Sequence, residues 1–233
     1  LAIGLLDGDS VVVEVHEPIG MEGSSAITIG TIVHGYRSLL EHAEEVYEGM
    51  AAMGPFGNSG ACNVNVNCSE GGDWQTEKKS VALITSGGFA SCTGALVNNV
   101  NEDGTPYFLT ANHCLGTPSS WVFYFNHESA TCSGSTGPTN QSISGATLKA
   151  NNAGSDFALV QLSSPPPTTY DVHYAGWDAT GTNPTSAVGI HHPSGDVKKI
   201  CFQDNAPTVS TASGASVWWI DDWEMGVTEP GSS

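Results

Sequence analysis

The chain has 233 residues, six Lys and Arg against 24 Asp and Glu, and a formal net charge of −18. This charge argues against binding to nucleic acid or to an anionic membrane surface, and no apolar run approaches the roughly 18 residues of a membrane span. Twenty-eight glycines and six cysteines favour an all-β, secreted protein with many turns. Neither C-x-x-C nor H-x-x-x-H spacing occurs, which argues against zinc.

The N-terminal part differs from the rest of the chain, because residues 1–53 hold nine acidic residues and a single Arg. β-Branched residues predict strands over 9–18 and 26–37, and residues 38–53 have helical character. Residues 54–60 are rich in glycine and predict an exposed linker where processing occurs. A small separate β-domain is the alternative for residues 1–53.

Short, regularly spaced strands predict a first β-barrel over residues 61–164 and a second over 165–233. Pro165 to Pro167 form a stiff connector between them. In the first barrel we expect strands at 80–85, 91–98, 107–110, 121–125, 146–150 and 157–162. In the second we expect strands at 172–177, 187–191, 199–202 and 217–220.

His113 is the first candidate for chemistry. It follows the end of an apolar strand and directly precedes Cys114. A neutral imidazole is a good general base near pH 7, because its unperturbed pKa is about 6.5. Cys92 lies in another strand-like segment 22 residues upstream, so a Cys92–Cys114 bridge could tether the loop. Taken alone, such a histidine is more often structural than catalytic.

Two later segments favour catalysis. Asp156 opens an apolar strand, where a carboxylate can accept a hydrogen bond from an imidazole N–H and hold its tautomer; a simple turn aspartate is the alternative. Gly231 lies two residues before Ser233, and glycine lets backbone N–H groups approach a substrate oxyanion. The chain order is His113, Asp156, Ser233, with spacings of 43 and 77 residues.

With these residues the chain resembles the chymotrypsin-like serine peptidases, and most closely the bacterial lysyl endopeptidase branch. The resemblance covers roughly residues 60–233 and rests on several segments that match in order: Gly60-Ala61-Cys62-Asn63 with Cys68, 92–99, 108–111 with His113-Cys114, Ser155-Asp156-Phe157, Ala175-Gly176-Trp177-Asp178, Ile190-His191-His192-Pro193 and 226–233. It implies a two-barrel trypsin-like fold with an incomplete second barrel. It also implies that residues 1–53 are the end of a propeptide.

The resemblance assigns roles to the candidate residues. Ser233 would be the nucleophile, His113 the base and Asp156 its orienting carboxylate, while the backbone N–H groups of Gly231 and Ser233 would bind the oxyanion. No cofactor or metal is implied. The partners would be a protein or peptide substrate, cleaved after Lys or Arg, and the protein's own propeptide, in a secreted bacterial enzyme.

The resemblance also bears on the remaining cysteines and on two aromatic residues. Cys68 and Cys132 match positions that pair, Cys62 matches one whose partner lies beyond Ser233, and Cys201 has no counterpart and could pair with Cys62 or elsewhere. Either tryptophan of the pair at 218–219 is a weak candidate for shaping the site, and the histidines at 191–192 are expected to be structural.

The chain stops at the residue that matches the nucleophile, before the strands and the specificity-determining carboxylate that follow in the family. We therefore expect the isolated 233-residue chain to be inactive and poorly folded in its second half. The alternative from another functional class is a non-catalytic barrel that acts as a binding or adhesion module. No Lys or Arg lies between Arg37 and Lys78, so we expect a protease of another specificity to cut the linker.

Overall fold

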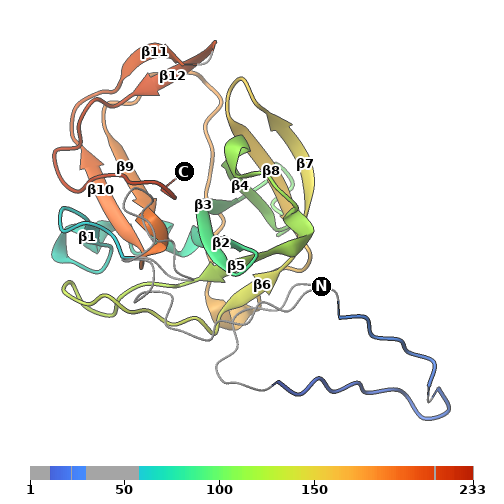
Figure 1. The fold of residues 1–233 in the computed structure, drawn as a ribbon. Helices are drawn as coiled ribbons and strands as arrows, with labels where there is room; N and C mark the ends of the chain where they lie inside the picture. Colours follow the sequence, from blue (N-terminus) through green and yellow to red (C-terminus); the bar gives the residue numbers. More distant parts are fainter. Residues whose placement is uncertain (1–10, 22, 30–57, 213, 233) are drawn as a thin grey trace, which may run out of the picture.

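The computed structural model describes residues 11–21, 23–29, 58–212 and 214–232 (Figure 1). Its regular elements are strands and short 3-10 helices, which confirms the predicted all-β class. The helices are η1 (Ser69–Trp74), η2 (Glu77–Ser80), η3 (Asn112–Cys114), η4 (Pro118–Ser120), η5 (Thr168–Tyr170) and η6 (Pro193–Gly195). Within the described ranges, none of the helices has the length and apolarity needed to cross a bilayer.

A curled, antiparallel sheet of seven strands forms the first half of the fold, in the order β6-β5-β2-β3-β4-β8-β7. Its strands are β2 (Val81–Ser86), β3 (Phe89–Val97), β4 (Tyr107–Ala111), β5 (Trp121–Phe125), β6 (Ser142–Ser144), β7 (Ala146–Asn152) and β8 (Phe157–Leu162). All six strands predicted for the first barrel are present, with ends that agree to within two residues. The short β6 has one buried apolar residue between two serines and gave too little signal to predict.

The core of this sheet is apolar and aromatic. Phe108 and Phe123 are fully buried, and their rings meet edge to face with centroids 4.9 Å apart. Burying a side chain of this kind contributes about 1.5–3 kcal/mol. Gly94 lies against this core: a Cβ there would be 2.3 Å from the Phe108 ring and 2.4 Å from the Leu109 carbonyl oxygen. Only glycine therefore fits at position 94 without displacing neighbouring atoms.

The second half has two smaller sheets; in Figure 1 their strands β9 to β12 are drawn in orange and red, and the early strand β1 is drawn in teal. Strands β1 (Val64–Asn65), β10 (Lys199–Gln203) and β9 (Ala187–His191) form an antiparallel sheet in that order. Strands β11 (Thr208–Ala212) and β12 (Ala215–Trp219) form a separate hairpin. The mostly polar sequence of β11 explains why it was not predicted.

The predicted strand at 172–177 does not form. Ala175 makes an isolated parallel bridge to Val97, whereas Val172 and Tyr174 pack against the core of the seven-stranded sheet. The alternation of apolar residues therefore mainly reflects packing on the sheet, and pairing within this segment is limited to the bridge at Ala175.

The two strands predicted near the N-terminus are also not observed where the structure describes these residues. Among the described residues, those at 11–18 and 26–29 pair with no strand, and Val12 is 91% exposed. Alternation favours a strand only where another strand supplies hydrogen bonds. The remaining predictions for residues 1–10 and 30–57, including the helical stretch and most of the linker, lie outside the described residues.

Polar side chains fill the contact between the two halves. Lys198, which is fully buried, lies 3.5 Å from the Glu128 carboxylate, and Lys78 lies 2.6 Å from it. Burial lowers the pKa of Lys198 to about 8. His192 is also fully buried and stacks on His127, with ring centroids 6.0 Å apart. The two halves are thus joined by charges and hydrogen bonds, unlike the apolar core of the first half.

Candidate active site

Strand pairing brings His113 and Asp156 together. Strand β4 leads into η3, which carries His113, and Asp156 immediately precedes β8, the neighbour of β4 with Ala111 opposite Phe157. His113 Nδ1 lies 2.7 Å from Asp156 Oδ2. The backbone N–H of His113 donates to Asp156 Oδ1 at 2.9 Å. One carboxylate therefore fixes both the ring and the chain that carries it.

The electrostatics of this pair suit a general base. The hydrogen bond from His113 lowers the pKa of the Asp156 carboxyl, although partial burial opposes this effect. The carboxylate is therefore ionised at neutral pH and favours a proton on Nδ1, which leaves the Nε2 lone pair available. The two side chains are 61% and 50% exposed, so Nε2 can be reached from solvent.

Two asparagines at the end of β7 support both loops. Asn151 Nδ2 donates to Asn112 Oδ1 at 2.7 Å, next to His113. Asn152 Oδ1 accepts hydrogen bonds from the backbone N–H groups of residues 154 and 155, at 2.8 and 3.0 Å, and so shapes the turn before Asp156. Asp156 itself has a φ of +51°, a conformation that aspartate tolerates better than most residues. Sequence analysis missed these asparagines, although Asn before a glycine turn was the available signal.

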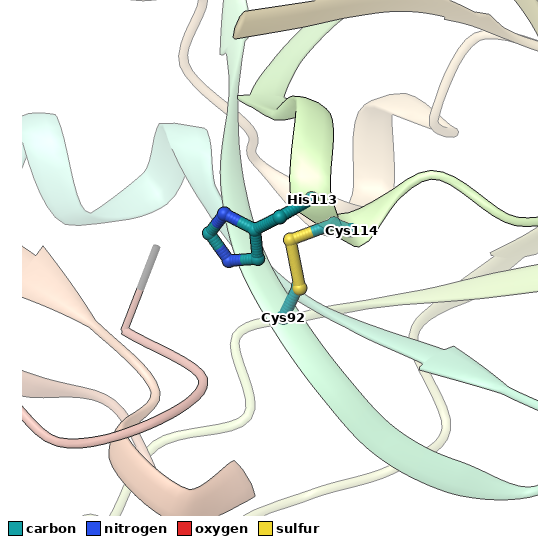
Figure 2. Close-up of side chains that lie close together, drawn as sticks. All are labelled: Cys92, His113 and Cys114. Atoms are coloured by element: carbon teal, nitrogen blue, oxygen red, sulfur yellow. A yellow bond between two sulfur atoms is a disulfide. The ribbon is translucent and has the colours of Figure 1, made fainter. Parts of the chain in front are cut away.

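A disulfide joins β3 to η3 beside the imidazole. Cys92 and Cys114 are bonded with a Cα–Cα distance of 6.2 Å, as the sequence suggested, and Figure 2 shows the bridge next to His113. The nitrogen and sulfur atoms of these three residues lie within 4.8 Å of one another, a spacing that metal ligands also have. Since the two sulfurs are bonded to each other, neither is a thiolate that could bind a metal ion.

The other cysteines follow the expected pattern in part. Cys68 and Cys132 form the second disulfide, with a Cα–Cα distance of 4.4 Å. Cys62 is exposed and Cys201 is buried, and both carry free thiols. The Cys62–Cys201 bridge that the sequence left open is therefore not formed.

The loop that carries Gly231 approaches the site from the second half. Gly231 has a φ of +91°, and its carbonyl oxygen accepts a hydrogen bond from Thr93 Oγ1 at 2.7 Å. Ser232 Oγ lies 2.8 Å from His191 Nδ1 and accepts the Glu229 backbone N–H at 3.1 Å. Ser233, the predicted nucleophile, lies outside the described residues.

His191 was expected to be structural, and its environment agrees with that role. It is 2% exposed, and burial lowers its pKa to about 4, so the ring is neutral at pH 7. A neutral Nδ1 can accept a hydrogen bond from the hydroxyl of Ser232. The contact between His191 and the loop was not foreseen, because the residues lie 41 positions apart.

An open cavity of about 380 Å³ lies where these elements meet. Residues of the seven-stranded sheet, among them Gly94 and Leu109, line it together with Asp156 and Ser232. The residues that line it do not include Trp218 or Trp219, which are about half exposed on β12. The cavity therefore lies between Asp156, the carboxylate partner of His113, and the loop of the second half; His113 itself is not among the lining residues.

Sequence comparisons find a matching family model and a curated relative. A family model described as "Lysyl endopeptidase, C-terminal domain" matches residues 56–233. A curated lysyl endopeptidase from Pseudomonas aeruginosa is 29% identical over 247 residues, which cover 98% of this chain and 51% of that protein. The chain thus spans about half the length of the curated relative that it matches.

Solved structures with similarity to the chain include human heparin binding protein, with a TM-score of 0.40, 16% identity and coverage of 55% of this chain and 60% of that one. The MamO protease domain from Magnetospirillum magneticum gives a TM-score of 0.41 at 11% identity, covering 62% of this chain and 70% of that one.

Proposed function

Because the chain belongs to the family of the lysyl endopeptidase C-terminal domain, we propose that it is the part of a serine endopeptidase that carries His113, Asp156 and Ser233 as its catalytic triad. The observation that carries the proposal is the 2.7 Å contact between His113 Nδ1 and Asp156 Oδ2 at the edge of the cavity. A carboxylate on Nδ1 is what a base acting through Nε2 requires.

The proposed reaction is amide hydrolysis through an acyl-enzyme. Ser233 Oγ attacks the carbonyl carbon of the scissile bond while its proton passes to His113 Nε2. The imidazolium, stabilised by Asp156, gives that proton to the leaving amine. Water then attacks the ester while His113 takes its proton, and His113 returns that proton to Ser233 Oγ as the acid product leaves. Backbone N–H groups of Gly231 and Ser233 stabilise the negative charge on the carbonyl oxygen.

A fluorophosphonate probe on the complete secreted protein tests the triad. We expect the probe to form an adduct at Ser233, mapped by peptide mass spectrometry, and to lose it in His113→Ala. The matched control is Ser232→Ala, which removes the neighbouring hydroxyl that faces His191 and should keep the labelling.

An adduct at Ser232 would reject Ser233 as the nucleophile. Absence of any adduct in the wild-type protein would favour the non-catalytic binding or adhesion module. The first result would reassign the nucleophile and the second would remove the proposed chemistry, while both would leave the His113–Asp156 geometry intact.

We further propose cleavage after Lys or Arg, on the strength of the family and the name of the curated relative. A cation recognised by a buried carboxylate should be preferred over an isosteric neutral side chain by about 10⁴-fold in kcat/KM. A peptide series that varies only the residue before the scissile bond tests this, and similar rates for Lys and Met peptides would contradict it.

The enzyme is proposed to be secreted and made with a propeptide in residues 1–53. Two disulfides support an oxidising location, and the family match begins at residue 56, within the predicted linker 54–60. Sequencing the N-terminus of the mature protein tests the boundary. A first residue at position 38 would mean cleavage after Arg37 and would refute both the boundary and processing by a protease of another specificity.

A further inference from the structure

Thr93 links the two halves of the molecule beside the candidate site. It lies in β3, is 3% exposed and lines the cavity. Its hydroxyl donates to the carbonyl oxygen of Gly231 at 2.7 Å and accepts the backbone N–H of His192 at 3.0 Å. Both partners belong to the second half, so one buried hydroxyl from the seven-stranded sheet satisfies two backbone groups across the junction.

The same residue is close in the covalent structure to the candidate base. Thr93 directly follows Cys92, which is bonded to Cys114, the neighbour of His113. The carbonyl of Thr93 also accepts a hydrogen bond from the buried Thr110 hydroxyl on β4 at 2.7 Å, which fixes the backbone at this point. The loop of Gly231 is therefore connected to the segment that carries His113 by one hydroxyl hydrogen bond, from Thr93, and by the Cys92–Cys114 disulfide.

Other contacts hold the Gly231 loop without involving the seven-stranded sheet. The Ser194 backbone N–H donates to Pro230 O at 2.7 Å, and Ser194 Oγ donates to Glu229 Oε2 at 2.8 Å. The backbone N–H of Gly60 donates to the other oxygen of Glu229 at 2.9 Å. These contacts shape the loop, but they do not connect it to the sheet that carries His113.

We propose that Thr93 is a positioning residue, which sets the distance and angle between the nucleophile loop and His113. The inference rests on the proposed function, since it assumes that residues 231–233 bind the oxyanion and supply the nucleophile. A misplacement of about 1 Å in such a site can reduce turnover about 100-fold. The backbone groups that stabilise an oxyanion act only when they are held in place before the reaction.

The test is Thr93→Val in the complete secreted protein, which keeps the shape of the side chain and removes the hydroxyl. We expect kcat to fall about 100-fold while KM changes less than about threefold, because the misplaced groups act in the transition state. Thr93→Ser, which restores the hydroxyl, should recover most of the turnover.

Thr85→Val is the matched control. Thr85 is a buried threonine of the same sheet, and its hydroxyl bonds to the carbonyl oxygen of Val122 within that sheet. We expect kcat to stay within about twofold of the wild type. Equal losses of turnover in Thr85→Val and Thr93→Val would mean a general loss of stability and would overturn the proposal.

A readout independent of catalysis separates this inference from the triad. Amide hydrogen exchange at His192 and over residues 229–232 should be faster in Thr93→Val and unchanged in Thr85→Val. A wild-type protein without peptidase activity would reject the proposed function, and unchanged exchange in Thr93→Val would then reject the link itself. Full turnover in Thr93→Val, in an active wild-type background, would reject the positioning role alone.

Discussion

The two halves of the molecule bury different kinds of side chain. The seven-stranded sheet encloses aromatic and aliphatic residues such as Phe108 and Phe123. The second half buries Ile200 and Cys201, but next to them lie Lys198, His192 and Asp196. An apolar core is stable by itself, whereas buried charges are tolerated only with partners. The second half draws on both sources for partners: Lys198 pairs with Glu128 of the first half at 3.5 Å, whereas Asp196 pairs with Lys199 of its own half at 3.3 Å.

The largest effect is expected on turnover, from a change in the half-exposed His113–Asp156 pair of the first half. Asp156→Asn should lower kcat about 10⁴-fold, because the amide favours the wrong imidazole tautomer. The free energy of unfolding should change by less than about 1 kcal/mol, because the pair is half exposed. Asp171→Asn is the control: it removes an exposed carboxylate, 2.6 Å from Lys79, and should leave kcat unchanged. Comparable losses of kcat in both variants would contradict the assigned role.

Phe108→Ala probes the apolar core of the first half. It removes a fully buried ring and should cost about 3–5 kcal/mol of unfolding free energy, measured by urea denaturation. Since the fully buried Lys198 of the second half takes its carboxylate partner, Glu128, from the first, we expect both halves to lose structure in one transition. A second half that stays folded after the first has unfolded would contradict this dependence of the second half on the first.

Glu128→Gln probes the polar junction. It removes the carboxylate that neutralises Lys78 and Lys198, and leaving such cations without a partner should cost about 3–5 kcal/mol. Here hydrogen exchange should become faster in β9 and β10 but stay slow in β4 and β8. Uniformly faster exchange in all four strands would show that the halves are not distinct in stability.

Acid should weaken the junction before it weakens the core. Burial lowers the pKa values of His127, His191 and His192 below the 6.5 of the unfolded chain, and that of His191 to about 4. The unfolded state therefore binds more protons as the pH falls from about 6.5 to 4, and stability decreases over this range. Each histidine contributes a slope of up to about 1.4 kcal/mol per pH unit. Denaturation at stepped pH measures the slope, and a flat profile from pH 7 to 4 would contradict it.

The smallest effect is expected in the β11–β12 hairpin. Trp218→Ser and Trp219→Ser alter side chains that are 51% and 49% exposed and do not line the cavity. We expect changes below about 0.5 kcal/mol in stability and no change in KM. A KM several-fold higher in either variant would instead assign the hairpin a part in substrate binding.

The sequence predicted the seven-stranded sheet well because its strands carry β-branched and aromatic residues between clear turns. It failed at 172–177, where apolar residues such as Tyr174 alternate because they rest on the sheet. The contact of His113 with Asp156 could be anticipated, since both residues flank strands and their roles follow from their chemistry. The hydrogen bonds of Thr93 could not, because their partners are 99 and 138 residues away and a threonine in a strand gives no signal of them.

Gly94 limits how this protein can be redesigned. Its missing side chain is what allows the Phe108 ring and the Leu109 carbonyl to pack directly against β3 beside the cavity, which Gly94 and Leu109 line. A library that randomises position 94 would yield misfolded variants in place of new specificities. Diversity introduced at the partly exposed Leu109 and Phe157, which line the same cavity, would alter its shape while the scaffold stays intact.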